Sequence, residues 1–144
     1  MELKFTAAEL QGYLGEVFPE TEGRFEILDL DAGRLRVKMR VGPGDLRPGG
    51  TVSGPTMFLL ADCAFYMATL ALIGREALTV TTNASIDFMR KPSPGDMTAD
   101  ARILKLGRSL SVGDVLIYSH GVAEPVARAG MTYSIPPKRA LEKD

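Results

Sequence analysis

The sequence has very little of the residues on which many catalytic and metal sites depend. Its 144 residues include one cysteine and one histidine. Cys63 stands alone, so a disulfide framework and a cysteine-based metal site are excluded, and we expect a buried, unreactive thiol. A Ser-His-Asp or Cys-His apparatus would have to use His120, and a histidine-rich metal site is excluded. Because His120 precedes Gly121 in a predicted turn, we expect it to be a surface residue.

An excess of charge of either sign is also missing. Seventeen Lys and Arg residues face 18 Asp and Glu residues, which gives a formal net charge of −1. Because the two signs are interspersed, the chain lacks the basic footprint of a nucleic-acid or membrane-surface partner. No apolar signal segment follows residues 1–4, so we expect a cytoplasmic protein. With 45% hydrophobic residues, the chain predicts a single globular domain over residues 1–144.

One long stretch, residues 51–74, is almost without charge, and Asp62 is its only charged residue. Ser53 can cap a helix here, Pro55 suits its first turn, and Gly74 can end it. Apolar side chains occur on every side of this predicted helix, so either protein or lipid must surround it. A central aspartate costs roughly 3 kcal/mol in a membrane and the flanks lack a basic belt, so we expect a helix buried in a globular fold.

The rest of the chain predicts one amphipathic helix and six strands. Thr6 and Glu9 form a capping box for the helix, whose Leu10, Leu14 and Val17 share a face. The period then changes to two, with a hairpin turn at residues 31–33 and turn residues between the later strands. The predicted ranges are a helix over 6–18, a strand hairpin over 24–41, an irregular loop over 42–50, strands over 78–89, 97–106, 109–118 and 125–135, and a loose tail over 136–144.

This order of elements predicts an α+β fold. Consecutive strands joined by short turns favour an antiparallel sheet, and the long helix between the two groups of strands must pack against that sheet. We therefore expect a six-stranded antiparallel sheet wrapped around one central helix, with a partner subunit covering the part of the helix that stays open.

Two positions in the central stretch are candidates for chemistry. Burying an unpaired carboxylate costs several kcal/mol, so Asp62 should lie at a cavity or an interface; the alternative is a carboxylate bound only by backbone or hydroxyl groups. The start of the helix offers the N–H groups of Gly54 and Thr56 to an anion, although it is equally consistent with an ordinary helix start. Eight residues separate Gly54 from Asp62, or about 12 Å along the axis, so they can share one bond only across a two-fold dimer.

The run Gly50-x-x-Ser53-Gly54-Pro55, followed by Leu60-Ala61-Asp62, resembles the hotdog-fold acyl-CoA thioesterases of the PaaI-like, phenylacetate-pathway type. The resemblance covers roughly residues 24–135. It continues in the short motifs at residues 85–90, 92–96, 106–109 and 127–133.

The resemblance implies a hotdog fold, a homodimer that often pairs into a homotetramer, and active sites at the subunit interface. It implies that the Gly54 N–H polarises the thioester carbonyl, that Asp62 acts as general base or nucleophile, and that Thr81, or its neighbour Thr82, holds the attacking water. No metal and no cofactor beyond the coenzyme A of the substrate are expected. Other site residues carried by the resemblance are Ser53 in the catalytic motif and, for the phosphates of coenzyme A, Arg90, Lys91, Arg108 and Ser109.

This chain departs from the family motif at three positions. Ser53 replaces the histidine of a His-Gly-Gly sequence, Pro55 replaces its second glycine, and Arg47 stands where an asparagine is common. A serine can cap the helix but cannot replace an imidazole, and loss of one oxyanion donor costs about a hundredfold to a thousandfold in rate. The leading hypothesis is a thioesterase for a small aryl or aliphatic acyl-CoA. The alternatives are a non-catalytic acyl-CoA or aromatic-ligand binding protein, and a hotdog hydratase, for which His120 is poorly placed.

Overall fold

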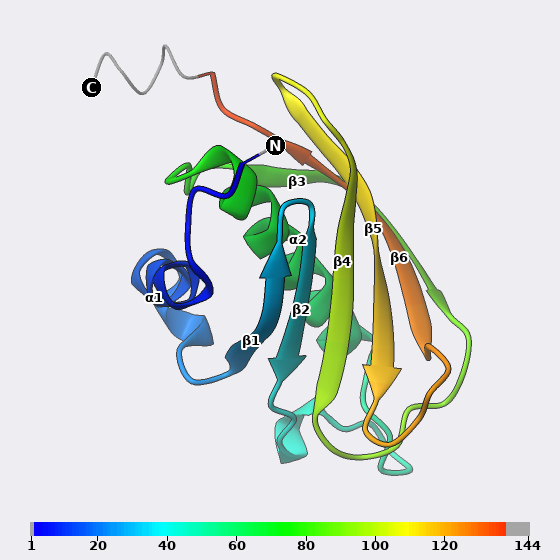
Figure 1. Cartoon of the computed structure of the whole chain (residues 1–144). Coiled ribbons are helices and arrows are strands. Elements are labelled where there is room, and N and C mark those ends of the chain that lie inside the picture. The colour runs from blue at the N-terminus through cyan, green and yellow to red at the C-terminus, as the bar shows by residue number, and fades with distance from the viewer. Residues whose placement is uncertain (1, 138–144) are drawn as a thin grey trace.

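Six antiparallel strands form one sheet that curls around a long helix in the computed structural model, which describes residues 2–137 (Figure 1). The strand order is β1-β2-β4-β5-β6-β3, so the chain leaves the sheet after β2, forms α2, and returns at the opposite edge. The elements are α1 (Ala7–Val17), β1 (Phe25–Asp31), β2 (Arg34–Met39), α2 (Gly54–Ile73), β3 (Val80–Phe88), β4 (Met97–Leu106), β5 (Leu110–Ser119) and β6 (Ala127–Ser134), with short 3₁₀ helices at Pro19–Thr21 and Pro43–Asp45.

Helix α2 begins and ends where local chemistry predicts. Ser53 is its N-cap, and Gly74 ends it with a φ of 94°, a conformation that glycine adopts without strain. Every residue from Cys63 to Leu72 is buried, so the second half of α2 is enclosed on all sides. By length and composition α2 is apolar enough to cross a membrane, but 72% of the relevant window is buried inside the fold, as in the core helix of a globular protein.

The first half of α2 leaves one stripe uncovered. The partly or fully exposed side chains are those of Pro55, Phe58, Leu59 and Asp62, which follow the i, i+3, i+4, i+7 spacing of a single helix face. Phe58 is 38% exposed, a high value for an aromatic residue on a core helix. The uncovered stripe therefore runs from the start of the helix to its one carboxylate.

The concave face of the sheet uses small residues so that α2 can approach closely. Gly113 on β5 is the tightest point, because a Cβ atom there would lie 2.0 Å from the carbonyl oxygen of Arg102 and 2.7 Å from the Phe65 ring. Phe65 is fully buried. A glycine at position 113 is therefore needed for the central aromatic side chain of α2 to pack against the sheet.

The two edges of the sheet differ. On the β1 side, the Gln11 amide of α1 donates to the Phe25 carbonyl oxygen and accepts the Ile27 N–H at 2.9 Å, so a side chain takes the place of a neighbouring strand. On the other side, β3 pairs only with β6 and most of its side chains are exposed, among them Val80 at 54% and Phe88 at 53%. The β3 edge is open.

The predicted elements are confirmed, including the capping box of α1 at Thr6 and Glu9. Several predicted boundaries differ from the structure by one or two residues, and one predicted loop contains a turn. Residues 42–50 were expected to be irregular, but Pro43–Asp45 form a 3₁₀ turn because the Asp45 carboxylate accepts the Gly42 N–H at 2.8 Å. Strand β3 begins at Val80 and not at 78, because the Thr79 N–H bonds back to the Glu76 carbonyl in a turn. Most of the tail expected to be loose, residues 138–144, lies outside the described residues.

Candidate active site

Asp62 lies at the wall of a cavity of about 430 Å³ and is held by two hydroxyl groups. Its Oδ1 accepts hydrogen bonds from the hydroxyls of Thr81 and Tyr133, each at 2.6 Å, and the Tyr133 hydroxyl also lies 2.9 Å from the Asp62 carbonyl oxygen. Within residues 2–137, no hydrogen bond reaches Oδ2. One carboxylate oxygen is therefore fixed, and the other is left for a ligand or water.

The two hydroxyls converge because their residues are direct cross-strand partners. Thr81 on β3 pairs with Tyr133 on β6, and the register shifts between Thr81 and Asn83, so Thr82 is the extra residue of a bulge. The Thr82 hydroxyl donates to the Thr132 carbonyl oxygen at 3.3 Å. Of the two threonines considered from the sequence, Thr81 is therefore the one that contacts Asp62.

Burial and the charge of Asp62 raise the pKa values of two neighbouring groups, Tyr133 and Cys63. Burial and then the Asp62 carboxylate raise the pKa of Tyr133 far above its ordinary value, so its hydroxyl stays protonated and acts as a donor. Burial and the same carboxylate raise the pKa of Cys63 to about 12, so the thiol is neutral. Cys63 is buried, as expected, and it lines the same cavity as Asp62.

Gly54 lines a second cavity of about 670 Å³ at the start of α2. Its N–H has no acceptor among the described residues, whereas the Thr56 N–H is taken by the Ser53 hydroxyl at 3.3 Å. The two donors expected at this helix start are therefore reduced to one. The cavity is apolar on one side, where the Phe88 ring lies against Gly54, and its charged lining residues are all basic: Arg47, Arg90 and Lys91.

Asp62 and Gly54 thus line separate cavities of one chain. Their separation along α2, about 12 Å, keeps them from acting on one bond within a subunit. The uncovered stripe of α2 connects them, so a second copy of the helix lying antiparallel on this stripe could bring the Asp62 of one subunit to the Gly54 of the other.

The four residues predicted to bind coenzyme A phosphates do not meet in one chain. Arg90 and Lys91 lie at the Gly54 cavity, where the Arg90 guanidinium donates to the Pro125 carbonyl oxygen at 2.6 Å. Arg108 lines a different cavity with Lys4, and Ser109 follows it in the β4–β5 turn. The length of β4 separates the two pairs, which lie at opposite ends of the sheet (Figure 1). His120 is exposed, as expected.

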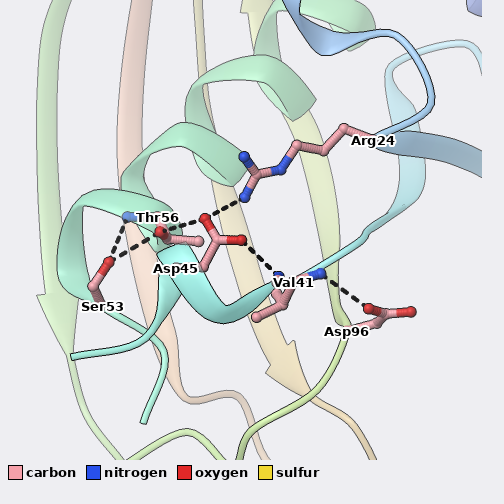
Figure 2. Close-up of polar contacts among 7 residues, drawn as sticks. Arg24, Val41, Asp45, Ser53, Thr56 and Asp96 are labelled. Carbon is pink, nitrogen blue, oxygen red and sulfur yellow. Dashed lines mark hydrogen bonds and ion pairs between the residues drawn. The ribbon is translucent and has the colours of Figure 1, made fainter. Parts of the chain in front are cut away.

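Sequence reasoning missed Tyr133 and the polar residues behind Ser53. Tyr133 is 71 residues from Asp62 in the chain. The one sequence signal for Tyr133 is its position in β6. The inward-facing residues before it are small or apolar, and Tyr133 adds a hydroxyl group to this apolar face. Behind Ser53, a chain of hydrogen bonds runs through Thr56 to Asp45 and Arg24 (Figure 2).

Comparisons with known proteins place this arrangement in a family. Residues 49–125 match the sequence profile of the thioesterase superfamily. A putative thioesterase from Silicibacter sp. TM1040 is 57% identical, with 95% of this chain and 96% of that chain covered and a TM-score of 0.89. The PaaI protein of the Escherichia coli phenylacetic acid degradation operon is 25% identical, with 89% and 96% covered and a TM-score of 0.73.

A protein from Streptococcus mutans UA159, solved bound to acetyl-CoA, shares the fold at 23% identity, with 81% and 91% covered and a TM-score of 0.70. No curated protein sequence matches this chain.

The fold and these matches define a hotdog-fold protein. The chain belongs to the thioesterase superfamily, and its similarity to PaaI proteins agrees with the motifs around Ser53, Gly54 and Asp62.

Proposed function

We propose that this protein is an acyl-CoA thioesterase, which hydrolyses a small aryl or aliphatic acyl-CoA to a free acid and coenzyme A. The observation that carries the proposal is the Asp62 carboxylate, whose Oδ1 is held by Thr81 and Tyr133 while its Oδ2 has no partner within residues 2–137. A carboxylate fixed in this way at a cavity suits the activation of water. The Gly54 N–H, which has no acceptor among the described residues, suits the negative oxygen that forms when water adds to a thioester.

The proposed reaction needs water and no cofactor beyond the coenzyme A of the substrate. Asp62 takes a proton as the water oxygen bonds to the thioester carbon, and the carbonyl oxygen gains negative charge beside the Gly54 N–H. The intermediate then collapses, the carbon–sulfur bond breaks, and the thiolate leaves and takes up the proton. Attack by Asp62 itself, through an anhydride that water then opens, gives the same products.

The site is proposed to form between two subunits. The open β3 edge offers unpaired backbone groups to the same edge of a second copy, and the covered β1 edge does not. Sheet joining at β3 would also cover exposed apolar side chains such as Val80 and Phe88. Arg90 and Lys91, at the Gly54 cavity, are proposed to contact the phosphates of coenzyme A. Arg108 and Ser109, at the other end of the sheet, are proposed to contact them from another subunit of the assembly.

The first experiment measures thiol release from a panel of aryl and aliphatic acyl-CoA thioesters, comparing the wild type with Asp62→Asn. Asparagine keeps an oxygen that can accept from Thr81 and Tyr133 but cannot take a proton, so turnover should be lost while the fold is kept. Full turnover in the variant would contradict the mechanism. Tight binding of intact acyl-CoA by the wild type, without thiol release, would favour a non-catalytic binding protein. This alternative is tested because Ser53 replaces the histidine of the family motif.

Mixed dimers test whether the site is shared. Gly54→Pro removes the N–H at the first position of the helix, where proline fits the backbone, and Gly54→Ala is the control for the Cβ, which meets the Phe88 ring at 3.3 Å. If Gly54 and Asp62 act across the interface, an equal mixture of unfolded Gly54→Pro and Asp62→Asn chains should refold to about a quarter of the wild-type activity, because half of the dimers carry one intact site. If both residues act within one subunit, the mixture stays as inactive as its parents.

A further inference from the structure

The residue before Gly54 is held by a chain of side-chain hydrogen bonds that ends at a partly buried ion pair (Figure 2). The Ser53 hydroxyl donates to the Thr56 hydroxyl at 2.9 Å, and the Thr56 hydroxyl donates to Asp45 Oδ1 at 3.0 Å. Arg24 contacts the same oxygen at 2.5 Å, and Asp45 Oδ2 accepts the Gly42 N–H at 2.8 Å. Arg24 precedes β1, so the chain of contacts connects the helix start to a distant part of the sequence.

The direction of these hydrogen bonds is fixed by their end point. An ionised carboxylate can only accept, so the Thr56 hydroxyl must give its proton to Asp45 and use a lone pair to accept from Ser53. Ser53 in turn accepts the Thr56 N–H at 3.3 Å. Because its hydroxyl proton is used inside the protein, and because Ser53 does not line the Gly54 cavity, the serine has no donor to offer to a ligand there.

Two backbone hydrogen bonds, one of them to Asp45, fix the direction of the Gly54 N–H beside this side-chain network. The Ser53 carbonyl accepts the Met57 N–H at 3.1 Å, and the Ser53 N–H donates to the Asp45 carbonyl at 2.8 Å. The Ser53 carbonyl and the Gly54 N–H belong to one planar peptide group and point in opposite directions. A carbonyl fixed toward the helix therefore fixes the Gly54 N–H away from the helix, at a residue that lines the cavity.

Burial of the Asp45 charge depends on its partners. The Asp45 side chain is 15% exposed and that of Arg24 is 29% exposed. A carboxylate in such a place is stable only when it is paired and hydrogen-bonded, and here three donors supply those bonds. The Nε of Arg24 is buried and has no hydrogen-bond partner within residues 2–137, so the guanidinium is oriented for the Asp45 contact and not for its own full hydrogen bonding.

We infer that Thr56, Asp45 and Arg24 are positioning residues that aim the Gly54 N–H at the substrate carbonyl, with Ser53 as the first member of their network. This inference rests on the proposed function. None of the four is a catalytic residue, because they act through the Ser53–Gly54 peptide group and not on the reacting atoms.

Thr56→Val and Thr56→Ser form the matched pair of variants. Valine keeps the shape of threonine but removes the hydroxyl, and serine keeps the hydroxyl. We expect kcat to fall about tenfold in Thr56→Val with KM changed less than about twofold, because a misaimed oxyanion donor is felt in the transition state. Thr56→Ser should restore kcat to within about twofold of the wild type. Urea unfolding of both variants checks that each is folded.

A second readout follows the carbonyl itself. Isotope-edited infrared spectroscopy of a bound thioester, measured in the Asp62→Asn background, reports the hydrogen bond to its carbonyl oxygen. The carbonyl stretch should move toward its free-solution frequency in Thr56→Val and stay at the wild-type position in Thr56→Ser. A purely structural role for Thr56 would leave this frequency unchanged.

The outcomes separate this inference from the proposed function. Suppose that the wild type releases thiol. The positioning role is then wrong if Thr56→Val changes neither kcat nor the carbonyl frequency. It is also wrong if kcat falls without a change in frequency, or if Thr56→Ser does not restore kcat. If the wild type binds thioesters without hydrolysing them, the proposed function is wrong, and the infrared comparison still decides the positioning role. A protein that neither binds nor hydrolyses them overturns both.

Discussion

The hydroxyl oxygen of Tyr133 lies 2.6 Å from Oδ1 of Asp62, although the two residues are 71 positions apart in the chain. Helix α2 provides the carboxylate and the inner side of β6 provides the hydroxyl. Thr81, the cross-strand partner of Tyr133, donates to the same oxygen. Two neighbouring strands thus orient a carboxylate on the helix that they enclose.

Removing the Tyr133 hydroxyl should impair catalysis more than stability. We expect Tyr133→Phe to lower kcat for thioester hydrolysis about tenfold, the effect of losing one hydrogen bond to a charged group. Tyr66→Phe is the matched control, because the Tyr66 ring stacks on Tyr133 at 5.9 Å between centroids and lines the same cavity, but its hydroxyl donates to the Ala77 carbonyl. Equal losses of kcat in steady-state assays of the two variants would contradict a specific role for Tyr133.

The bulge in β3 predicts opposite results at adjacent threonines. Thr81→Val removes a donor to Asp62 Oδ1 and should lower kcat about tenfold. Thr82→Val removes only an exposed hydrogen bond to the Thr132 carbonyl and should leave kcat within about twofold of the wild type. Thiol release under saturating acyl-CoA measures both. A larger effect at position 82 would show that the β3 register differs in the working enzyme.

The close contact of β5 with α2 predicts a stability effect. Gly113→Ala would place a Cβ against the Arg102 carbonyl and the Phe65 ring, so we expect the free energy of unfolding to fall by about 3 kcal/mol. Gly130→Ala on β6 is the control, because a Cβ there meets nothing within 4 Å, and its unfolding free energy should change by less than about 1 kcal/mol. Urea denaturation of both variants decides the matter, and similar midpoints would argue against the close contact.

Acid should weaken the fold partly through Asp45. Burial raises the pKa of this carboxyl, but hydrogen bonds from Gly42, Arg24 and Thr56 together with the charge of Arg24 outweigh burial, so the pKa lies below its ordinary value. A carboxyl with a lower pKa in the folded state stabilises the protein at neutral pH, and this contribution is lost as the pH falls below about 4 and through the folded-state pKa.

The corresponding measurement is the free energy of unfolding as a function of pH. We expect it to fall less steeply below about pH 4 in Asp45→Asn than in the wild type, because the variant has no carboxyl to protonate at this position. Identical slopes would mean that protonation of Asp45 does not contribute to acid unfolding.

Local chemistry alone located almost every element. The capping groups at Thr6 and Ser53 and the left-handed Gly74 act within a few residues of the chain, so the ends of both helices could be predicted. The alternation of apolar residues in the strands is equally local. The 3₁₀ turn at residues 43–45 was missed because glycine and proline indicate a loop, whereas the turn depends on one Asp45 contact with Gly42.

The candidate site could be predicted only in part. Asp62 was conspicuous because it is the single charge in a long apolar helix, and Gly54 because it follows an N-cap. The choice between Thr81 and Thr82 was beyond the sequence, since a bulge breaks the simple alternation of faces on which such a choice depends.

By itself, the sequence determined the helices, the strands, the isolation of Asp62 and the start of α2 at Ser53 and Gly54, because these follow from hydrogen bonds and periodicities within a few residues. Only the tertiary structure decided that Thr81 and Tyr133 hold Asp62, that Arg24 and Asp45 stand behind Ser53, and that one sheet edge is covered while the other is open. Those relationships join residues far apart in the chain, and their geometry is set by the curl of the sheet around the helix.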